Sequence, residues 1–113
     1  MLISCLFCKI ANKETPADIV YEDDKFLAFK DINPQAPVHI LVIPKKHIPS
    51  VDHLEVQDKE LMGEMFLVAQ KVAREKKLSP NGYRLVLNVG KEAGQTVNHL
   101  HLHILGGKTL PWP

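Results

Sequence analysis

Three histidines alternate with apolar residues in the segment His99-Leu100-His101-Leu102-His103-Ile104. This alternation predicts a β-strand that carries all three imidazoles on one face, because successive side chains of a strand point to opposite faces. Imidazoles titrate near neutral pH, act as nucleophiles and bind metals. The pattern therefore indicates a chemical site, with a solvated amphipathic strand as the alternative. Gly106-Gly107 ends the strand directly afterwards.

A fourth histidine, His39, lies inside the apolar segment Val38–Ile43, which predicts a buried strand closed by Pro44. A histidine at such a position, taken alone, is more often a core residue whose nitrogen binds a backbone carbonyl. Three further histidines on an expected partner strand favour a second interpretation. In that interpretation one imidazole is a nucleophile, and its neighbours orient it and protonate a leaving group.

The loop that leads into the histidine strand, Asn88–Thr96, contains Gly90 and Gly94. Glycines let a backbone fold tightly enough to present N–H groups to an anion, and Gln95 and Thr96 add side-chain donors. The loop is no Walker A motif, because the required Gly-Lys-Ser/Thr is missing. Beside the histidines it indicates a phosphate-binding loop.

Cys5 and Cys8 have a spacing that suggests metal or redox chemistry in a reducing compartment. Together with His47 and His99 they make a Cys₂His₂ set that suits tetrahedral zinc. Two alternatives stay open: two reduced cysteines packed as small apolar residues, or a catalytic zinc on the histidine strand itself. A catalytic zinc would consume the imidazoles that nucleophilic chemistry needs.

The elements that must position these residues follow from periodicity and turn signals. Apolar spacing predicts a short helix over Cys5–Lys13 and one long helix over Gln57–Lys77. Alternating or β-branched segments predict five strands, at Ile19–Tyr21, Phe26–Phe29, Val38–Ile43, Tyr83–Val89 and Leu100–Leu105. This succession predicts an α+β fold with a five-stranded antiparallel sheet. A sheet with one main helix leaves uncovered edges, which favours a homodimer.

The composition narrows the function classes. A length of 113 residues predicts a single domain over 1–113. A formal net charge of +1 gives no electrostatic reason to bind nucleic acid or a membrane surface. The apolar runs are too short to span a bilayer, and Met1–Ser4 has no secretory character, so a cytoplasmic location is expected.

With these motifs the chain resembles the histidine triad (HIT) family, whose signature is His-φ-His-φ-His-φ-φ with φ apolar. His99–Leu105 matches that signature at every position. Further matching blocks extend over nearly the whole chain: Phe7–Ile10, Tyr21–Asp24, Asp31–His39, Val42–His47, Gly94-Gln95, Leu105–Gly107 and Trp112-Pro113. The nearest branch is the nucleotide-binding phosphoramidase type.

The resemblance implies a homodimer whose two sheets join into one, and hydrolysis of purine nucleoside 5′-phosphoramidates and related adenylates to a nucleoside monophosphate such as AMP or GMP. His101 would be the nucleophile and form a covalent nucleotidyl-histidine. His39 would position His101, while His103 and His99 would support the phosphate and the proton transfers. This mechanism needs no cofactor for catalysis.

The resemblance also implies a nucleotide-binding set. Asp31 would bind the ribose hydroxyls, while Ile32, Leu6 and Phe7 would flank the purine. The phosphate would be surrounded by His101, His103, Asn88, Gly94, Gln95 and Thr96. Some members bind zinc through residues that correspond to Cys5, Cys8, His47 and His99, so a structural zinc is expected here.

Three other functions remain alternatives at this point. A dinucleoside polyphosphate hydrolase is the neighbouring enzyme class, and the Leu105-Gly106-Gly107…Trp112-Pro113 ending argues against it. A non-catalytic nucleotide-binding regulatory module would have no need of a nucleophile at His101. A purely structural zinc module would use Cys5, Cys8 and two histidines and leave His39 and His103 unexplained.

Overall fold

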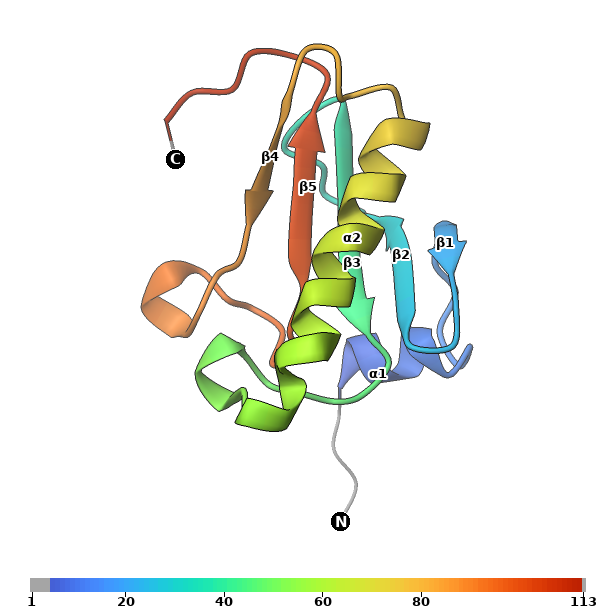
Figure 1. The fold of residues 1–113 in the computed structure, drawn as a ribbon, viewed down its shortest axis with the longest axis vertical. Helices are drawn as coiled ribbons and strands as arrows, with labels where there is room; N and C mark the ends of the chain where they lie inside the picture. The colour runs from blue at the N-terminus through green and yellow to red at the C-terminus, as the bar shows by residue number, and fades with distance from the viewer. Residues whose placement is uncertain (1–4, 113) are drawn as a thin grey trace.

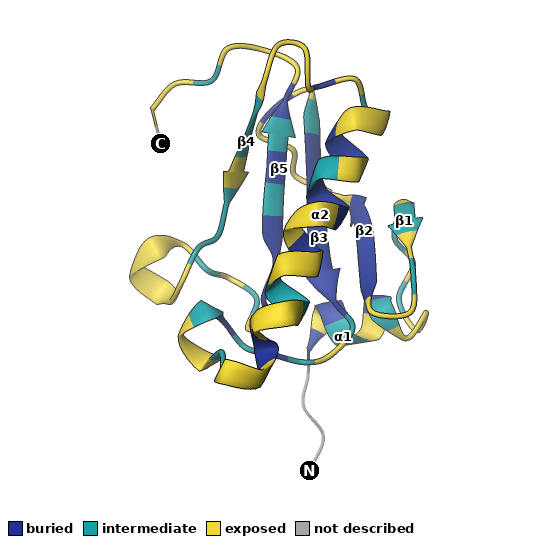
Figure 2. Cartoon of the chain, in the orientation of Figure 1, coloured by how far each residue is buried: buried dark blue, intermediate teal, exposed yellow. Residues whose placement is uncertain are grey.

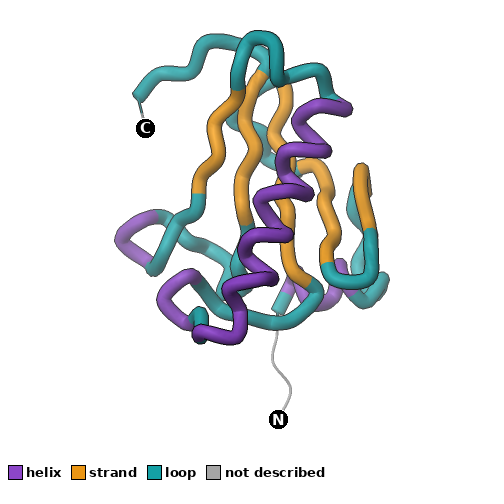
Figure 3. The backbone as a smooth tube through the Cα atoms, viewed as in Figure 1, coloured by secondary structure: helices purple, strands orange, loops and turns teal. Residues whose placement is uncertain are grey.

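A five-stranded antiparallel sheet in the order β1-β2-β3-β5-β4 forms the centre of the structure (Figure 1). The structure is a computed structural model and describes residues 5–112. Figure 3 shows the strands side by side with the long helix across them. The strands are β1 (Ile19–Glu22), β2 (Phe26–Lys30), β3 (Val38–Pro44), β4 (Tyr83–Val86) and β5 (Leu102–Gly106). The helices are α1 (Leu6–Ala11) and α2 (Lys59–Glu75), with short 3-10 helices at Val51–His53, Val56–Asp58 and Lys91–Ala93.

Helix α2 covers one face of the sheet and forms the larger core. Its buried residues, Met65, Val68, Ala69, Val72 and Ala73, recur at three and four positions, as an amphipathic helix requires. They pack on alternate residues of the strands below, among them Ala28, Val42, Leu102 and Ile104. Figure 2 shows this buried stripe of the helix facing the buried central strands.

The short helix α1 packs on the opposite face of the sheet. Phe7 and Ile10 of α1 join the intervening strand residues Leu27, Phe29 and Leu41 in a second, smaller core. A six-residue helix has little stability of its own, so these contacts and its first-turn cap maintain it. The Sγ of Cys5 supplies that cap by accepting the N–H of Cys8 at 3.2 Å.

The predicted fold class is confirmed: an α+β fold with a five-stranded antiparallel sheet, one long helix and a short N-terminal helix. Several boundaries differ. The long helix begins at Lys59, because Val56–Asp58 forms a separate 3-10 turn. The fourth strand ends at Val86 instead of Val89, since its last partner on β5 is His103.

The histidine strand also begins later than predicted. Regular pairing of β5 with β3 starts at Leu102, so His99 and His101 precede the strand. Beyond Val42, the partner of Leu102, the two segments diverge: the N–H of Leu100 donates to the carbonyl of Ile48 at 2.6 Å. The alternation nevertheless continues through this irregular segment, and Leu100 lies in the α2-side core with Leu102.

Two predictions concern residues outside the described range: the lack of secretory character at Met1–Ser4, and Pro113 of the matching Trp112-Pro113 block. Among residues 5–112, neither helix combines the length and apolar character that a membrane crossing requires.

Candidate active site and metal centre

The three triad histidines and His39 lie close together on the α1 side of the sheet. His99 and His101 are buried, His103 is half-buried, and His39 on β3 is buried beside them. The ring centroids of His101 and His103 lie 5.0 Å apart, and those of His39 and His103 lie 5.1 Å apart. The structure therefore brings together the residues predicted to be catalytic.

The ring of His101 is held in one tautomer by the backbone. Its Nδ1 lies 2.7 Å from the carbonyl oxygen of His99, so Nδ1 carries the hydrogen and donates it. The lone pair is then on Nε2. The edge of Phe7 packs against the ring at 5.0 Å between centroids. Burial lowers the pKa of His101 below its usual value, so the imidazole is neutral and nucleophilic near pH 7.

His39 is held in the opposite tautomer. The backbone N–H of Gln35 donates to its Nδ1 at 3.0 Å, so its hydrogen is on Nε2. That Nε2 lies 2.8 Å from Nδ1 of His103, which must accept, and His103 consequently carries its own hydrogen on Nε2. The prediction that His39 positions His101 does not rest on a direct hydrogen bond: within residues 5–112 the His39 ring bonds to His103, while His101 bonds to a carbonyl.

Burial also favours the neutral forms of these two rings. Burial is the main cause that lowers the pKa of His39, and the nearby Asp31 carboxylate opposes it. For His103, burial together with the neighbouring His101 and His39 lowers the pKa to about 4. Both rings are therefore neutral near pH 7, as their mutual hydrogen bond requires.

A pocket of about 320 Å³ opens beside His101 and His103. Seven of the predicted site residues line it: Leu6, Phe7, Asp31, Ile32, Thr96, His101 and His103. Nine further residues of its wall were not predicted: Ile10, Thr15, Pro16, Ala17, Phe29, Lys30, Asn33, Leu41 and Val97. Phe29 and Leu41 could have been found, because strand alternation places them on the triad face. No sequence signal indicated the loop residues Thr15 to Ala17.

Three residues predicted at the phosphate, Asn88, Gly94 and Gln95, do not line this pocket. Their hydrogen bonds shape the loop instead. The Gln95 side chain accepts from Gly90 N–H at 2.9 Å and donates to the Pro49 carbonyl at 2.7 Å. The Asn88 amide donates to a carbonyl within the same loop at 2.9 Å. Gly94 has φ 88°, a left-handed conformation that favours glycine.

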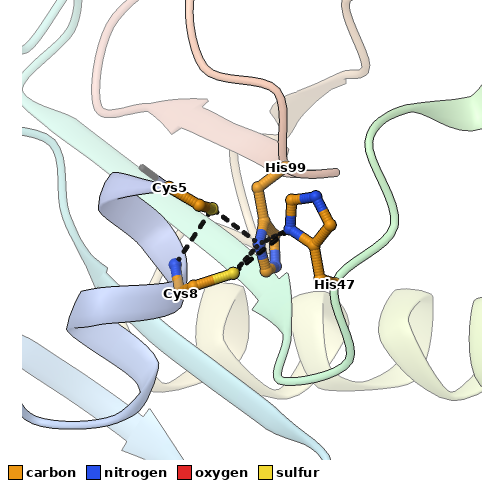
Figure 4. Close-up of side chains that lie close together, drawn as sticks. All are labelled: Cys5, Cys8, His47 and His99. Atoms are coloured by element: carbon orange, nitrogen blue, oxygen red, sulfur yellow. Dashed lines mark hydrogen bonds between the residues drawn. The ribbon is translucent and has the colours of Figure 1, made fainter. Parts of the chain in front are cut away.

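Cys5, Cys8, His47 and His99 converge at one end of the sheet (Figure 4). His99 donates from Nε2 to the Pro44 carbonyl at 2.8 Å, so its Nδ1 lone pair faces the cluster. That Nδ1 lies 3.4 Å from each sulfur and 3.2 Å from Nδ1 of His47, and Cys8 Sγ lies 3.1 Å from the same His47 atom.

These distances, 3.1 to 3.4 Å, are close to but slightly shorter than those around a tetrahedral zinc ion. Zinc bonds of about 2.3 Å to sulfur and about 2.0 Å to nitrogen place neighbouring ligand atoms about 3.3 to 3.8 Å apart. Burial and the adjacent Cys5 raise the pKa of the Cys8 thiol to about 11. A bound dication would lower this pKa again, because thiols that coordinate a metal ion lose their protons. The four residues thus have the donor types and spacing of a structural zinc site.

The low pKa of His103 leads to a prediction about acid stability. The unfolded chain binds protons on imidazoles near pH 6.5, whereas folded His103 binds one only near pH 4. We therefore expect the free energy of unfolding to fall as pH drops from about 6.5 to about 4. Urea denaturation at several pH values measures this, and His103→Asn should flatten the dependence. The same substitution at the exposed His53 is the control; equal flattening by both would contradict the assignment.

The comparisons with known proteins agree with this geometry. The sequence profile of the HIT domain matches residues 12–110. An uncharacterized HIT-like protein of Synechocystis is 54% identical over 108 residues, which covers 96% of this chain and 94% of that protein.

Solved structures give the same result. A HIT family hydrolase from Legionella pneumophila superposes with a TM-score of 0.95 at 52% identity, covering 97% of this chain and 98% of that one. A histidine triad protein from Clostridium difficile gives 0.95 at 47% identity, with coverages of 100% and 98%. The matched residues include the whole segment His99–Leu105. The chain therefore belongs to the HIT domain family.

Proposed function

We propose that this protein hydrolyses purine nucleoside 5′-phosphoramidates and related adenylates through a nucleotidyl group carried on His101. One observation carries the proposal: His101, which lines the pocket, donates its Nδ1–H to the main-chain carbonyl of His99, so the neutral ring keeps its lone pair on Nε2. Membership of a family in which a neighbour at 52% identity is named a hydrolase supports the general reaction class.

The reaction has two balanced steps. In the first, His101 Nε2 forms a bond to phosphorus, the P–N bond breaks, and the leaving nitrogen takes up a proton to depart as an amine. The His101 ring then bears a positive charge, and its Nδ1–H remains bonded to the His99 carbonyl. In the second step water attacks phosphorus, the P–Nε2 bond breaks, and a proton is returned. The products are a nucleoside monophosphate and the amine.

The pocket wall suits a nucleotide. Leu6 and Ile32 are 45% and 88% exposed, so two apolar side chains are available to flank a purine. The Asp31 carboxylate in the same wall can accept ribose hydroxyls. His103 presents its Nε2–H, and the Thr96 hydroxyl is a second donor near the phosphate. AMP or GMP is the expected product.

We propose a structural zinc at Cys5, Cys8, His47 and His99. When bound, it would neutralise the two thiolates and cross-link α1 to the segments around His47 and His99. No step of the reaction passes through it, because His99 uses its ring for the metal cluster and only its backbone carbonyl for His101. The catalytic and the metal-binding roles are therefore compatible.

The test is release of AMP and ammonia from adenosine 5′-phosphoramidate by the purified protein, with and without a zinc chelator. Turnover in both conditions supports the proposal. Diadenosine polyphosphates serve as competing substrates, and preferential cleavage of these would favour the dinucleoside polyphosphate hydrolase. Binding of AMP without turnover of any substrate would favour a regulatory module.

The homodimer is proposed on the free edge of β4. Within the described chain this strand pairs only with β5. Leu85 on β4 and Val89 just beyond it are 36% and 38% exposed. An edge strand with apolar side chains is stabilised when its free edge pairs with the same strand of a second copy, which joins two sheets into one.

We expect Leu85→Arg to convert the dimer into a monomer, as measured by sedimentation velocity at micromolar concentration, because the cation would be buried in the joined edge. The control is Ile19→Arg on β1, the opposite edge strand, where the side chain is 38% exposed. If Ile19→Arg dissociates the protein and Leu85→Arg does not, the sheets join through β1 instead.

A further inference from the structure

Asp31 lies beside the hydrogen bond between His39 and His103. Its Oδ1 accepts the N–H of Asn33 at 2.8 Å, and its Oδ2 lies 3.4 Å from Nε2 of His39. The Asp31 N–H also donates to the His39 carbonyl at 3.0 Å, which ties the two residues together. The side chain of Asp31 is 19% exposed and that of His39 is 3% exposed, so the carboxylate acts at short range with little solvent screening.

The proposed reaction, on which this inference rests, needs a proton at the leaving nitrogen. His103 lines the pocket and carries a hydrogen on Nε2. It can give that proton away and remain a neutral imidazole only if it has first become positively charged, with hydrogens on both nitrogens. The negative phosphate of a bound substrate favours this uptake of a proton.

Protonation of His103 creates a conflict with His39. The new hydrogen on His103 Nδ1 would face the hydrogen on His39 Nε2, 2.8 Å away. His39 cannot move its hydrogen to Nδ1, because the Gln35 N–H already points at that nitrogen. Neither nitrogen then offers a lone pair to the other, so both N–H groups must turn to other acceptors.

Asp31 is the acceptor within reach. We propose that Asp31 is a positioning residue for proton transfer as well as a sugar ligand: its Oδ2 accepts the His39 Nε2–H when His103 takes up the proton that the leaving amine will carry away. In the resting protein His39 donates its Nε2–H to His103. When His103 is positively charged, His39 donates the same hydrogen to Asp31. The Asp31 charge also raises the pKa of both His39 and His103 against the effect of burial.

The same three side chains have the donor types of a metal site, and their ligand atoms lie within 4.8 Å of one another. The hydrogen bond from Gln35 argues against that use. A metal on His39 Nε2 would displace its hydrogen while Nδ1 still accepts from Gln35, which leaves a doubly deprotonated ring. The geometry suits proton sharing better than metal binding.

The test compares two substrates that share one ribose and differ in the leaving group. Adenosine 5′-phosphoramidate needs a proton on its leaving nitrogen, whereas adenosine 5′-(4-nitrophenyl phosphate) releases a stable anion. Asp31→Asn keeps the shape and the Asn33 contact but removes the charge. We expect it to lower kcat for the phosphoramidate about tenfold more than kcat for the nitrophenyl ester. Loss of the ribose contact alone would affect both substrates equally.

The control variant is Asp18→Asn, an exposed carboxylate paired with Lys30 at 3.5 Å, which should leave both rates unchanged. Equal losses on the two substrates in Asp31→Asn would overturn the inference. If the wild type cleaves neither substrate, the proposed function fails instead. The inference is then judged on ¹⁵N NMR of the histidine rings with AMP bound: Asp31→Asn must alter the His39 Nε2–H and His103 Nδ1 signals, and unchanged signals refute it.

Discussion

Replacement of His101 by alanine should lower the release of AMP from adenosine 5′-phosphoramidate by about three orders of magnitude or more, while the variant still binds AMP. The reason is positional. Among the triad nitrogens, only Nε2 of His101 has a lone pair that no neighbouring group uses. The Nδ1 lone pair of His99 faces the Cys/His cluster, and that of His103 accepts from His39. Without His101, only water remains as nucleophile.

The measurement is steady-state hydrolysis, together with AMP affinity by calorimetry and melting temperature for the variant. A base quench of the wild-type reaction should trap one nucleotidyl group on the peptide that contains His101, as read by mass spectrometry, because phosphorus–imidazole bonds resist base. His53→Ala, at an exposed position at the end of the 3-10 helix Val51–His53, is the matched control. Turnover that persists in His101→Ala, or an adduct on another histidine, would refute the mechanism.

The second large effect concerns zinc. The purified protein should bind one Zn²⁺ per chain, and Cys8→Ala should abolish this binding, because Cys8 Sγ contacts both His47 and His99. Free metal at about 1,000 times its dissociation constant adds about 4 kcal/mol of stability. For a domain of this size we therefore expect metal removal to lower Tm by about 15 °C.

Metal content by mass spectrometry and thermal unfolding with and without a chelator measure this effect. Lys9→Ala, on the same short helix but exposed, controls for damage to α1. Below its melting temperature the chelated wild type should still release AMP, since the proposed reaction uses no metal. A chelator that leaves Tm unchanged would show that Cys5 and Cys8 are packed as small apolar residues instead.

Much of the fold was predictable because two simple periodicities govern it. Alternation placed Leu102 and Ile104 in the core and the histidines on the other face, and helical spacing selected the buried stripe of α2. Strand ends were less predictable. The β5 ladder starts only at Leu102 because the N–H of Leu100 bonds to Ile48, a loop contact without a sequence signature.

The same distinction holds for the site. The residue types of the triad and of the Cys/His cluster identified both groups from the sequence, and the structure brings each group together. The hydrogen-bond partner of each histidine ring could not be predicted. His39 donates to His103 because the backbone N–H of Gln35 occupies its Nδ1 and leaves the hydrogen on Nε2. Every non-proline residue has such an N–H, so the sequence does not indicate which one will bind the ring. The Gln95 side chain is absent from the pocket wall because its amide bonds to Gly90 N–H and to the carbonyls of Pro49 and Val97, and the sequence does not indicate these partners.

The hydrogen bond from His101 to the carbonyl of His99 has an evolutionary consequence. A carbonyl belongs to the main chain and survives any substitution of the side chain attached to it. A lineage could therefore replace the His99 imidazole, together with Cys5, Cys8 and His47, and lose the metal while the nucleophile keeps its orientation. The proposed metal site and the proposed reaction centre share only His99, so the first could be lost or gained while the second stays unchanged.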